Sequence, residues 1–230
     1  MKIVNLEGKV LFELRDAAMK ETVEEAVRQG VELDRVNLAR ADLMGANLKG
    51  AVLYGACLRE AFLQGANLEG ANLGAADLVQ ARLTQANLIG ANLKVASMVW
   101  AWLKDANLSS ANLTYTNLCR ANLNGANCEN AKIERSILCG AYLRNAKLSG
   151  ASLACSILEG ADLNKADLLG ANLKLASFHA SNLSHATLIG AKVLGTDFES
   201  ANMYQTQLDS EIEANATLKK AFGRLKTQTA

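Results

Sequence analysis

The stretch that decides the fold is Ala41-Asp42-Leu43-Met44-Gly45-Ala46-Asn47-Leu48-Lys49-Gly50, in which one five-residue pattern is written twice. The pattern continues over residues 31–210 without insertion or deletion, and its central residue falls at every fifth position from Leu33 to Leu208. Of these 36 centres 29 are Leu, and the residue two places before the centre is Ala 28 times. A strict period of five matches neither a helix nor a strand. It fits a coil in which each side takes five residues and points two of them inward.

The exceptions keep the character of their position. The seven other centres are all apolar, namely Met98, Cys128, Ile133, Phe178, Val193, Phe198 and Met203. The eight other inward small positions hold Val31, Val36, Thr116, Ser136, Ser156, Ser181, Thr196 and Thr206. The pattern therefore predicts a narrow core of Leu and Ala with few aromatic rings.

Segments such as Ala46-Asn47-Leu48 and Ala161-Asp162-Leu163 resemble the A-(D/N)-L-x-x signature of the pentapeptide-repeat family, and the resemblance covers residues 31–210. It implies an all-β fold, a right-handed quadrilateral β-helix (solenoid) with four five-residue sides per coil. In that fold the residue before each centre and the two after it face solvent. Residues 31–210 would then form about nine coils, a rod roughly 43 Å long at the spacing of neighbouring strands.

Residues twenty apart should stack on neighbouring coils. One such column holds asparagines, whose side-chain amides can hydrogen-bond along the axis as they do in cross-β structures: Asn47, Asn67, Asn87, Asn107 and Asn127. Another is rich in glycine, which adopts positive φ easily and can turn the corners of a chain that has no proline: Gly50, Gly70, Gly90, Gly150, Gly170 and Gly190.

Both ends of such a coil need covers, because open strand edges recruit other chains. We expect residues 1–30 to form an N-terminal cap, with a short strand over 9–14 and a short helix. Thr22-Val23-Glu24-Glu25 resembles a capping box that opens this helix, and Gly30 is placed to end it. Residues 211–230 form the C-terminal segment, where apolar residues between Glu211 and Lys226 predict an amphipathic capping helix. A partner-binding tail is the alternative for that segment.

Charge and composition argue against several classes of protein. The net charge is +1, and residues 31–210 carry fifteen basic and fifteen acidic side chains. A nucleic-acid binder needs a clustered basic face, so we expect no direct nucleic-acid contact. We expect no signal peptide, no membrane span and no membrane association. Five cysteines without a CxxC pair favour a cytoplasmic protein with reduced thiols.

The sequence offers little chemistry, and we expect no enzyme, no cofactor and no metal site. His179 and His185 should both be solvated, and zinc needs four converging ligands. Cys128 is a centre and should be buried, whereas Cys57 and Cys155 should face outward alone. Cys119 and Cys139 are twenty apart, so they should stack close enough for a disulfide. In the cytosol we expect them to remain two thiols.

One surface feature is a candidate binding site. Trp100 and Trp102, the only tryptophans, should face outward at one corner of one coil, beside an apolar column and within an aromatic one. Exposed apolar patches often mark interaction sites, and Trp and Tyr are frequent binding anchors. The candidate partner-binding residues are Phe62, Val79, Val99, Trp100, Trp102, Cys119, Cys139 and Tyr142, together called the Trp stripe below.

Several functions are compatible with this surface. The first is a non-catalytic protein-interaction or scaffold module that binds another protein through the Trp stripe, and a homodimer contact is a variant of it. The resemblance implies an alternative, because some family members mimic duplex DNA, bind the topoisomerase DNA gyrase and confer quinolone resistance. The neutral balance of residues 31–210 departs from such a mimic, which needs a strongly acidic face. A purely structural protein is the third reading.

Overall fold

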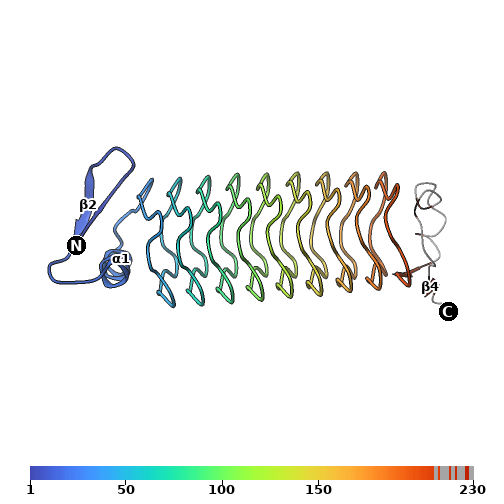
Figure 1. Ribbon diagram of the computed structural model, residues 1–230, viewed down its shortest axis with the longest axis horizontal. Coiled ribbons are helices and arrows are strands. Elements are labelled where there is room, and N and C mark those ends of the chain that lie inside the picture. Colours follow the sequence, from blue (N-terminus) through green and yellow to red (C-terminus); the bar gives the residue numbers. More distant parts are fainter. Residues whose placement is uncertain (210–211, 213–217, 219–220, 222–225, 228–230) are drawn as a thin grey trace.

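A computed structural model describes residues 1–209, 212, 218, 221 and 226–227. Strand β1 (Lys2–Val4) pairs antiparallel with β2 (Val10–Glu13), and helix α1 (Met19–Arg28) follows. A long solenoid comes next, and Figure 1 shows its coils stacked along one axis beyond the N-terminal hairpin and helix. Near its far end β3 (Gln207–Leu208) pairs in parallel with β4 (Lys226–Thr227).

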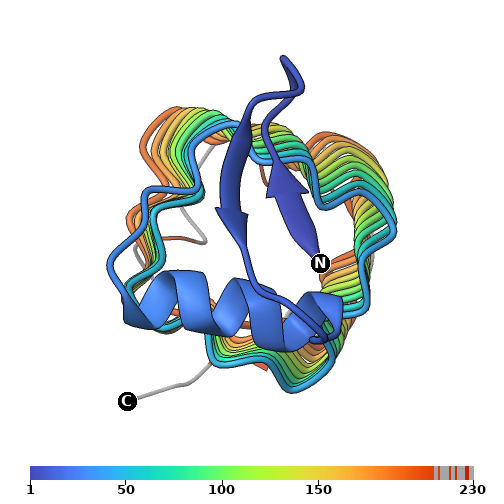
Figure 2. The same ribbon diagram turned by 90° about the vertical axis from the view of Figure 1, so that its left-hand side faces the viewer.

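The coils are joined by parallel bridges between residues twenty apart. The series begins with Asn37 opposite Cys57 and continues to Thr187 opposite Gln207, with one bridging residue on each five-residue side. Four such sides make up the twenty-residue repeat, and the view down the axis shows the four-sided outline of the stack (Figure 2). The fold is therefore a β-solenoid whose sides are too short to count as long strands.

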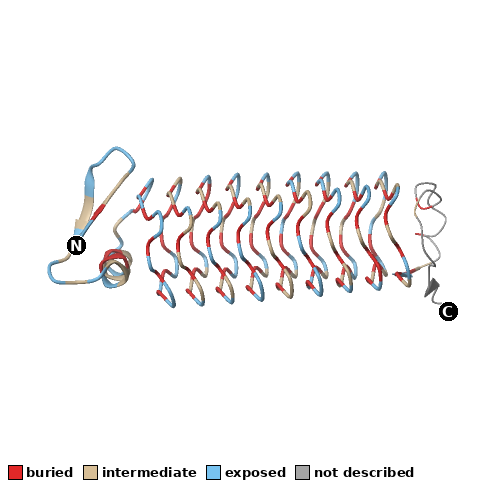
Figure 3. Cartoon of the chain, in the orientation of Figure 1, coloured by how far each residue is buried: buried red, intermediate tan, exposed pale blue. Residues whose placement is uncertain are grey.

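The core is the stack of inward side chains that the sequence predicts. Every centre from Leu33 to Leu208 is buried except Val193, which is half-buried. In Figure 3 buried segments recur around every coil. Inward hydroxyls are mostly paired, as when Thr116 Oγ1 donates to the carbonyl of Leu93 at 2.8 Å. Ser181 Oγ is buried and has no hydrogen-bond partner among the described residues.

Almost every corner is a β-turn closed by the carbonyl of the centre. Leu48, for example, accepts from the amide of Ala51 at 3.0 Å, and Gly50 in the turn has φ 68°. Positive φ recurs at every fifth residue from Arg35 to Gln205, whatever the side chain. The glycine column thus turns the corners as predicted, but the sequence does not show that Val95, at φ 63°, does the same.

Within the interior coils the backbone of a side satisfies four of its five amides, as residues 67–71 illustrate. Asn67, Leu68 and Gly70 donate to carbonyls of neighbouring coils at 2.9, 2.7 and 2.9 Å, and Ala71 closes the turn on Leu68 at 3.0 Å. The fifth amide, that of Glu69, donates to Oδ1 of Asn67 at 3.2 Å. This last bond explains why Asn or Asp so often precedes the centre, because an Asx side chain can cap its own turn.

The asparagine ladder is present in part. Asn67 Nδ2 donates to Asn47 Oδ1 at 3.4 Å, and Asn87 Nδ2 donates to Asn67 Oδ1 at 3.2 Å. For Asn107 and Asn127 the side-chain oxygen accepts the turn amide two residues later, at 3.1 and 3.0 Å. Asn107 and Asn127 are half-buried, as are Asn67 and Asn87. Capping the turn is therefore the more general role of the asparagine column.

The N-terminal hairpin and helix lie across the first coil, as Figure 2 shows. The strand expected over 9–14 is found as β2, but the capping-box prediction is wrong. Helix α1 begins at Met19, and Glu21 Oε2 accepts from the backbone amide of Ala18 at 2.6 Å. Thr22 lies inside the helix, where it is buried and donates from Oγ1 to the carbonyl of Ala18 at 2.7 Å.

The expected C-terminal helix falls mostly outside the described residues. Ile212 and Leu218 are buried, and both belong to the core cluster. Lys226, where we expected the helix to end, instead lies in β4. Ile212 is helical and Lys226 begins a strand, so the helix between them stays a prediction.

Leu103→Asp should destabilise the protein by several kcal/mol, because it places an unpaired charge in the core. Asn107→Asp should cost about 1 kcal/mol or less, since an aspartate can also cap the turn, as Asp77 does for the amide of Val79 at 3.1 Å. Thermal or urea unfolding of the two variants measures the difference. Equal melting temperatures would contradict the inward and outward assignment.

Val95→Gly should stabilise the protein by about 1 kcal/mol, because a β-branched residue is strained at positive φ and glycine is not. Val99→Gly is the matched control, since Val99 is not among the residues with positive φ; it should be neutral or destabilising. Urea unfolding of both variants provides the comparison. A loss of stability in Val95→Gly as large as in the control would show that the corner is not strained.

Candidate functional site

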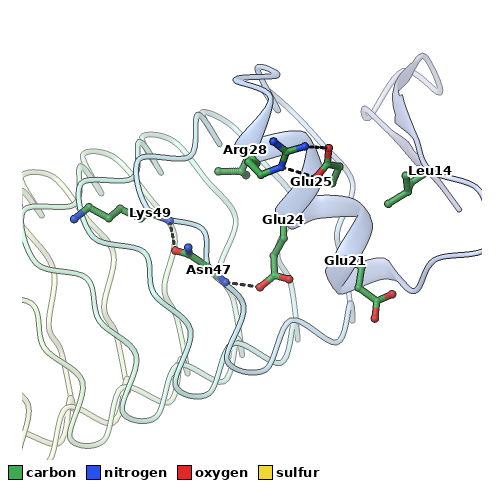
Figure 4. Close-up of a pocket in the computed structure, with 8 residues that line it drawn as sticks. Leu14, Glu21, Glu24, Glu25, Arg28, Asn47 and Lys49 are labelled. Carbon is green, nitrogen blue, oxygen red and sulfur yellow. Dashed lines mark hydrogen bonds and ion pairs between the residues drawn. The ribbon is translucent and has the colours of Figure 1, made fainter.

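A large depression, with a volume of about 640 Å³, lies at the seam between helix α1 and the first coils (Figure 4). Its charged side chains have structural partners. Glu25 pairs with Arg28 and accepts from Gln29, and these contacts lower the pKa of Glu25 to about 2. Lys49 pairs with Glu69 at 2.9 Å. The depression is therefore the place where α1 caps the edge of the first coils.

The edge itself is closed by Glu24. In later coils the residue before the centre donates its amide to the preceding coil, as Asn67 does to the carbonyl of Ala46 at 2.9 Å. Asn47 belongs to an early coil, and its amide donates to Oε1 of Glu24 at 2.7 Å instead. A side chain of α1 thus replaces the missing coil.

Glu24→Ala should lower the free energy of unfolding by about 1 kcal/mol, because it leaves the amide of Asn47 without its acceptor. Glu13→Ala is the control, since Glu13 makes only an exposed ion pair with Lys2 at 3.5 Å; it should change stability by about 0.5 kcal/mol or less. Urea unfolding of both variants is the measurement. If Glu24→Ala matched the control, Glu24 would not be the cap.

The Trp stripe occupies the side of the rod. Trp100 is 44% exposed, Trp102 56% and Tyr142 46%. Phe62, Val79, Val99, Cys119 and Cys139 are half-buried. The bridges place Phe62, Arg82, Trp102, Asn122 and Tyr142 in one column.

Two arginines lie over rings of the stripe. The guanidinium carbon of Arg82 is 4.8 Å from the ring centroid of Phe62, and that of Arg120 is 5.1 Å from the ring of Trp100. Cation–π contacts of this kind hold a guanidinium in place and leave its edge free to donate. Neither Arg82 nor Arg120 has a carboxylate partner among the described ion pairs, whereas nearby Arg40 binds Glu60 at 3.0 Å.

The stripe borders two depressions. One has a volume of about 400 Å³ and is lined by Arg40, Glu60, Phe62, Gln80, Arg82, Trp100 and Trp102. The other has a volume of about 270 Å³ and is lined by Gln64, Arg82, Thr84 and Trp102. Arg82 and Trp102 belong to both, so these two side chains stand between the depressions.

Three successive coils of this column lack the side chain that caps the turn. In other coils of the column, Oδ1 of Asp42 and of Asn122 accepts the amide two residues later at 3.1 Å. The same position is occupied by Phe62, Arg82 and Trp102 in the three coils between them. Within the described part of the chain, the amides of Gln64, Thr84 and Lys104 consequently have no acceptor. The sequence already shows these three departures from Asn or Asp, twenty residues apart. That each departure leaves an amide without an acceptor becomes clear only from the Asx hydrogen bonds of the structure.

The other residues singled out by the sequence lie as follows. Cys128 is buried, and burial raises its pKa to about 12. Cys119 and Cys139 are free thiols in contact, and the pKa of Cys139 is raised by burial and then by Cys119. Two exposed histidines, His179 and His185, lie apart, the second with its ring 5.6 Å from that of Tyr204.

The described residues contain no group of three or more His, Cys, Asp or Glu side chains placed to hold a metal ion. In that same part of the chain, no helix has the length and apolar character needed to cross a bilayer.

Fold and surface together define a solenoid built from five-residue repeats with an exposed aromatic stripe. A family model described as pentapeptide repeats matches residues 29–65, 66–103, 101–140, 141–179 and 181–210, with eight copies. The chain belongs to the pentapeptide-repeat family, whose members are right-handed quadrilateral β-helices and generally non-catalytic modules.

Solved structures of the family resemble the chain. HetL, a pentapeptide-repeat protein involved in the regulation of heterocyst differentiation in the cyanobacterium Nostoc, is 29% identical, with 80% of this chain and 96% of that one covered and a TM-score of 0.49. QnrB1, a plasmid-mediated fluoroquinolone resistance protein, is 14% identical, with coverages of 82% and 94% and a TM-score of 0.49. No curated protein matches the chain.

Proposed function

We propose that this protein is a non-catalytic interaction module that binds another protein through the Trp stripe. The observation that carries the proposal is the exposure of Trp100 and Trp102, 44% and 56%, beside a depression of about 400 Å³. Large rings at the wall of a depression are the usual anchors of protein interfaces. The two tryptophans differ from most outward positions of the repeat, which hold small or polar side chains.

The proposal also covers the handedness of the coil, which follows from the family, and the cellular compartment, which follows from the free thiols. We assign this chain the right-handed, four-sided coil of the family, a rigid support for a flat binding surface. Its five free cysteines favour the cytoplasm. A second copy of the chain is the rival occupant of the stripe.

DNA mimicry is the weaker candidate. A mimic requires acidic side chains massed on one face, whereas neighbouring coils here pair opposite charges. Arg40 binds Glu60 at 3.0 Å, and Arg59 binds Asp77 at 3.0 Å. This pairing supports a stripe-based partner over a topoisomerase that recognises a DNA-like surface.

The Trp100→Lys/Trp102→Lys double variant should lose the partner in a pull-down from native lysate. Leu194→Lys/Tyr204→Lys is the matched control, because these side chains are 73% and 45% exposed in the last coils of the rod, away from the stripe; it should retain the partner. Bound proteins are identified by mass spectrometry, and the size of the free protein is measured by light scattering.

Each outcome of the pull-down has one meaning. A protein lost only with the tryptophan variant supports the proposal. DNA gyrase recovered with all three forms would overturn it in favour of mimicry. A wild-type dimer that becomes monomeric in the tryptophan variant would assign the stripe to self-association.

A further inference from the structure

We propose that the partner's recognition element is an acidic peptide segment, whose carboxylates bind the unpaired amides and arginines of the column Phe62–Arg82–Trp102. This inference rests on the proposed function and specifies the chemistry of the partner. On many sides of the coils an Asn or Asp oxygen accepts the amide two residues after it. At Phe62, Arg82 and Trp102 no such oxygen is present, as is also the case at Ile137, Ile157 and Ser177. A carboxylate from the partner would occupy the place of that oxygen.

The unpaired amides form a short row. Gln64, Thr84 and Lys104 occupy equivalent positions on successive coils, each two residues after a position where an Asx side chain could accept the amide. Gln64 and Thr84 also line the depression of about 270 Å³ beside Trp102. Successive outward amides of this kind make an anion-binding surface, and unmet donors favour a ligand that supplies acceptors.

The side chains of the column add the charge. Arg82 lines both depressions, and Arg120 lies over Trp100, the ring that lines the larger one. Both guanidiniums lack a carboxylate partner among the described residues, whereas Arg40 is neutralised by Glu60. Within the described residues, both guanidiniums are held over aromatic rings, have no carboxylate partner and accompany amides without acceptors. Such a surface favours carboxylates, which guanidinium binds in bidentate geometry. Trp102, more than half exposed, supplies the apolar contact between them.

The same arrangement disfavours single-stranded nucleic acid. Such ligands stack their bases on open aromatic faces along an extended basic groove. Here Arg82 covers a face of Phe62 and Arg120 a face of Trp100, at 4.8 and 5.1 Å. The solenoid as a whole has equal numbers of acidic and basic side chains. A peptide that carries a few carboxylates matches two cations better than a polyanion does.

The test uses a variant that restores the family pattern. Arg82→Asn supplies the missing oxygen to the amide of Thr84 and removes one cation, so it should keep or raise the melting temperature and yet block the site. Lys132→Asn is the matched control, because Lys132 is an exposed residue before its centre, on the opposite side of the rod and about two and a half coils further along. It makes the same change of residue type and charge on another side of the rod.

A library of random 12-residue peptides displayed on phage is panned against the immobilised full-length protein, and selected peptides are measured by fluorescence anisotropy. Selected peptides should be rich in Asp and Glu beside an apolar residue. Their affinity should fall at least about tenfold in Arg82→Asn and remain unchanged in Lys132→Asn. A fluorescent twelve-nucleotide oligothymidylate is tested in parallel.

Several results would overturn the inference. These are selection of basic or uncharged peptides, no selection at all, equal affinity in the two variants, and oligothymidylate binding that is lost in Arg82→Asn. The proposed function has its own outcome, because a partner that is lost with the tryptophan variant but kept by Arg82→Asn would leave the stripe as the interface and exclude acidic recognition.

Discussion

The constraint on which the structure depends is that a five-residue side must bury two side chains while backbone carbonyls are within reach of only four of its five amides. Neighbouring coils and the turn take four amides, and the Asx side chain takes the fifth, as Asn67 does for Glu69. Buried or half-buried amides without acceptors are costly. The five-residue signature therefore combines two requirements, a core of Leu and Ala and a polar cap for each turn.

The same requirement determines how the rod begins. A coil has donors and acceptors on both edges, and the first coil has no predecessor to meet them. The N-terminal segment supplies substitutes one by one: the carbonyl of Val4 accepts from the amide of Asn37 at 2.8 Å, and Glu24 accepts from that of Asn47 at 2.7 Å. The cap is thus a set of specific hydrogen-bond partners as well as an apolar cover.

The sequence predicts the core well because the period of five is strict and each position has one environment. It predicts less where the backbone conformation of a position does not depend on the type of residue that occupies it. Corner residues adopt positive φ even when they are Val95 or Trp100, since the closed turn overrides individual preference. Helix α1 begins three residues before the Thr22 box, because Glu21 reaches the amide of Ala18 without a capping hydroxyl. Counting by twenty places the Trp stripe and puts Arg82 next to Phe62 and Arg120 next to Trp100, but it does not show that the guanidiniums lie over the rings.

Departures from the repeat are informative because the repeat itself explains so much. An Asn or Asp before the centre is accounted for by the turn it caps, so its presence indicates nothing about partners. Phe62, Arg82 and Trp102 give up that bond in three successive coils. Local stability would favour Asn at each of them. Arg82 and Trp102 are exposed, and Arg82 gains the contact over the ring of Phe62 at 4.8 Å. What sets this column apart is that the missing bonds occur beside a depression lined by Arg82 and Trp102, and the acidic-peptide proposal starts from that combination.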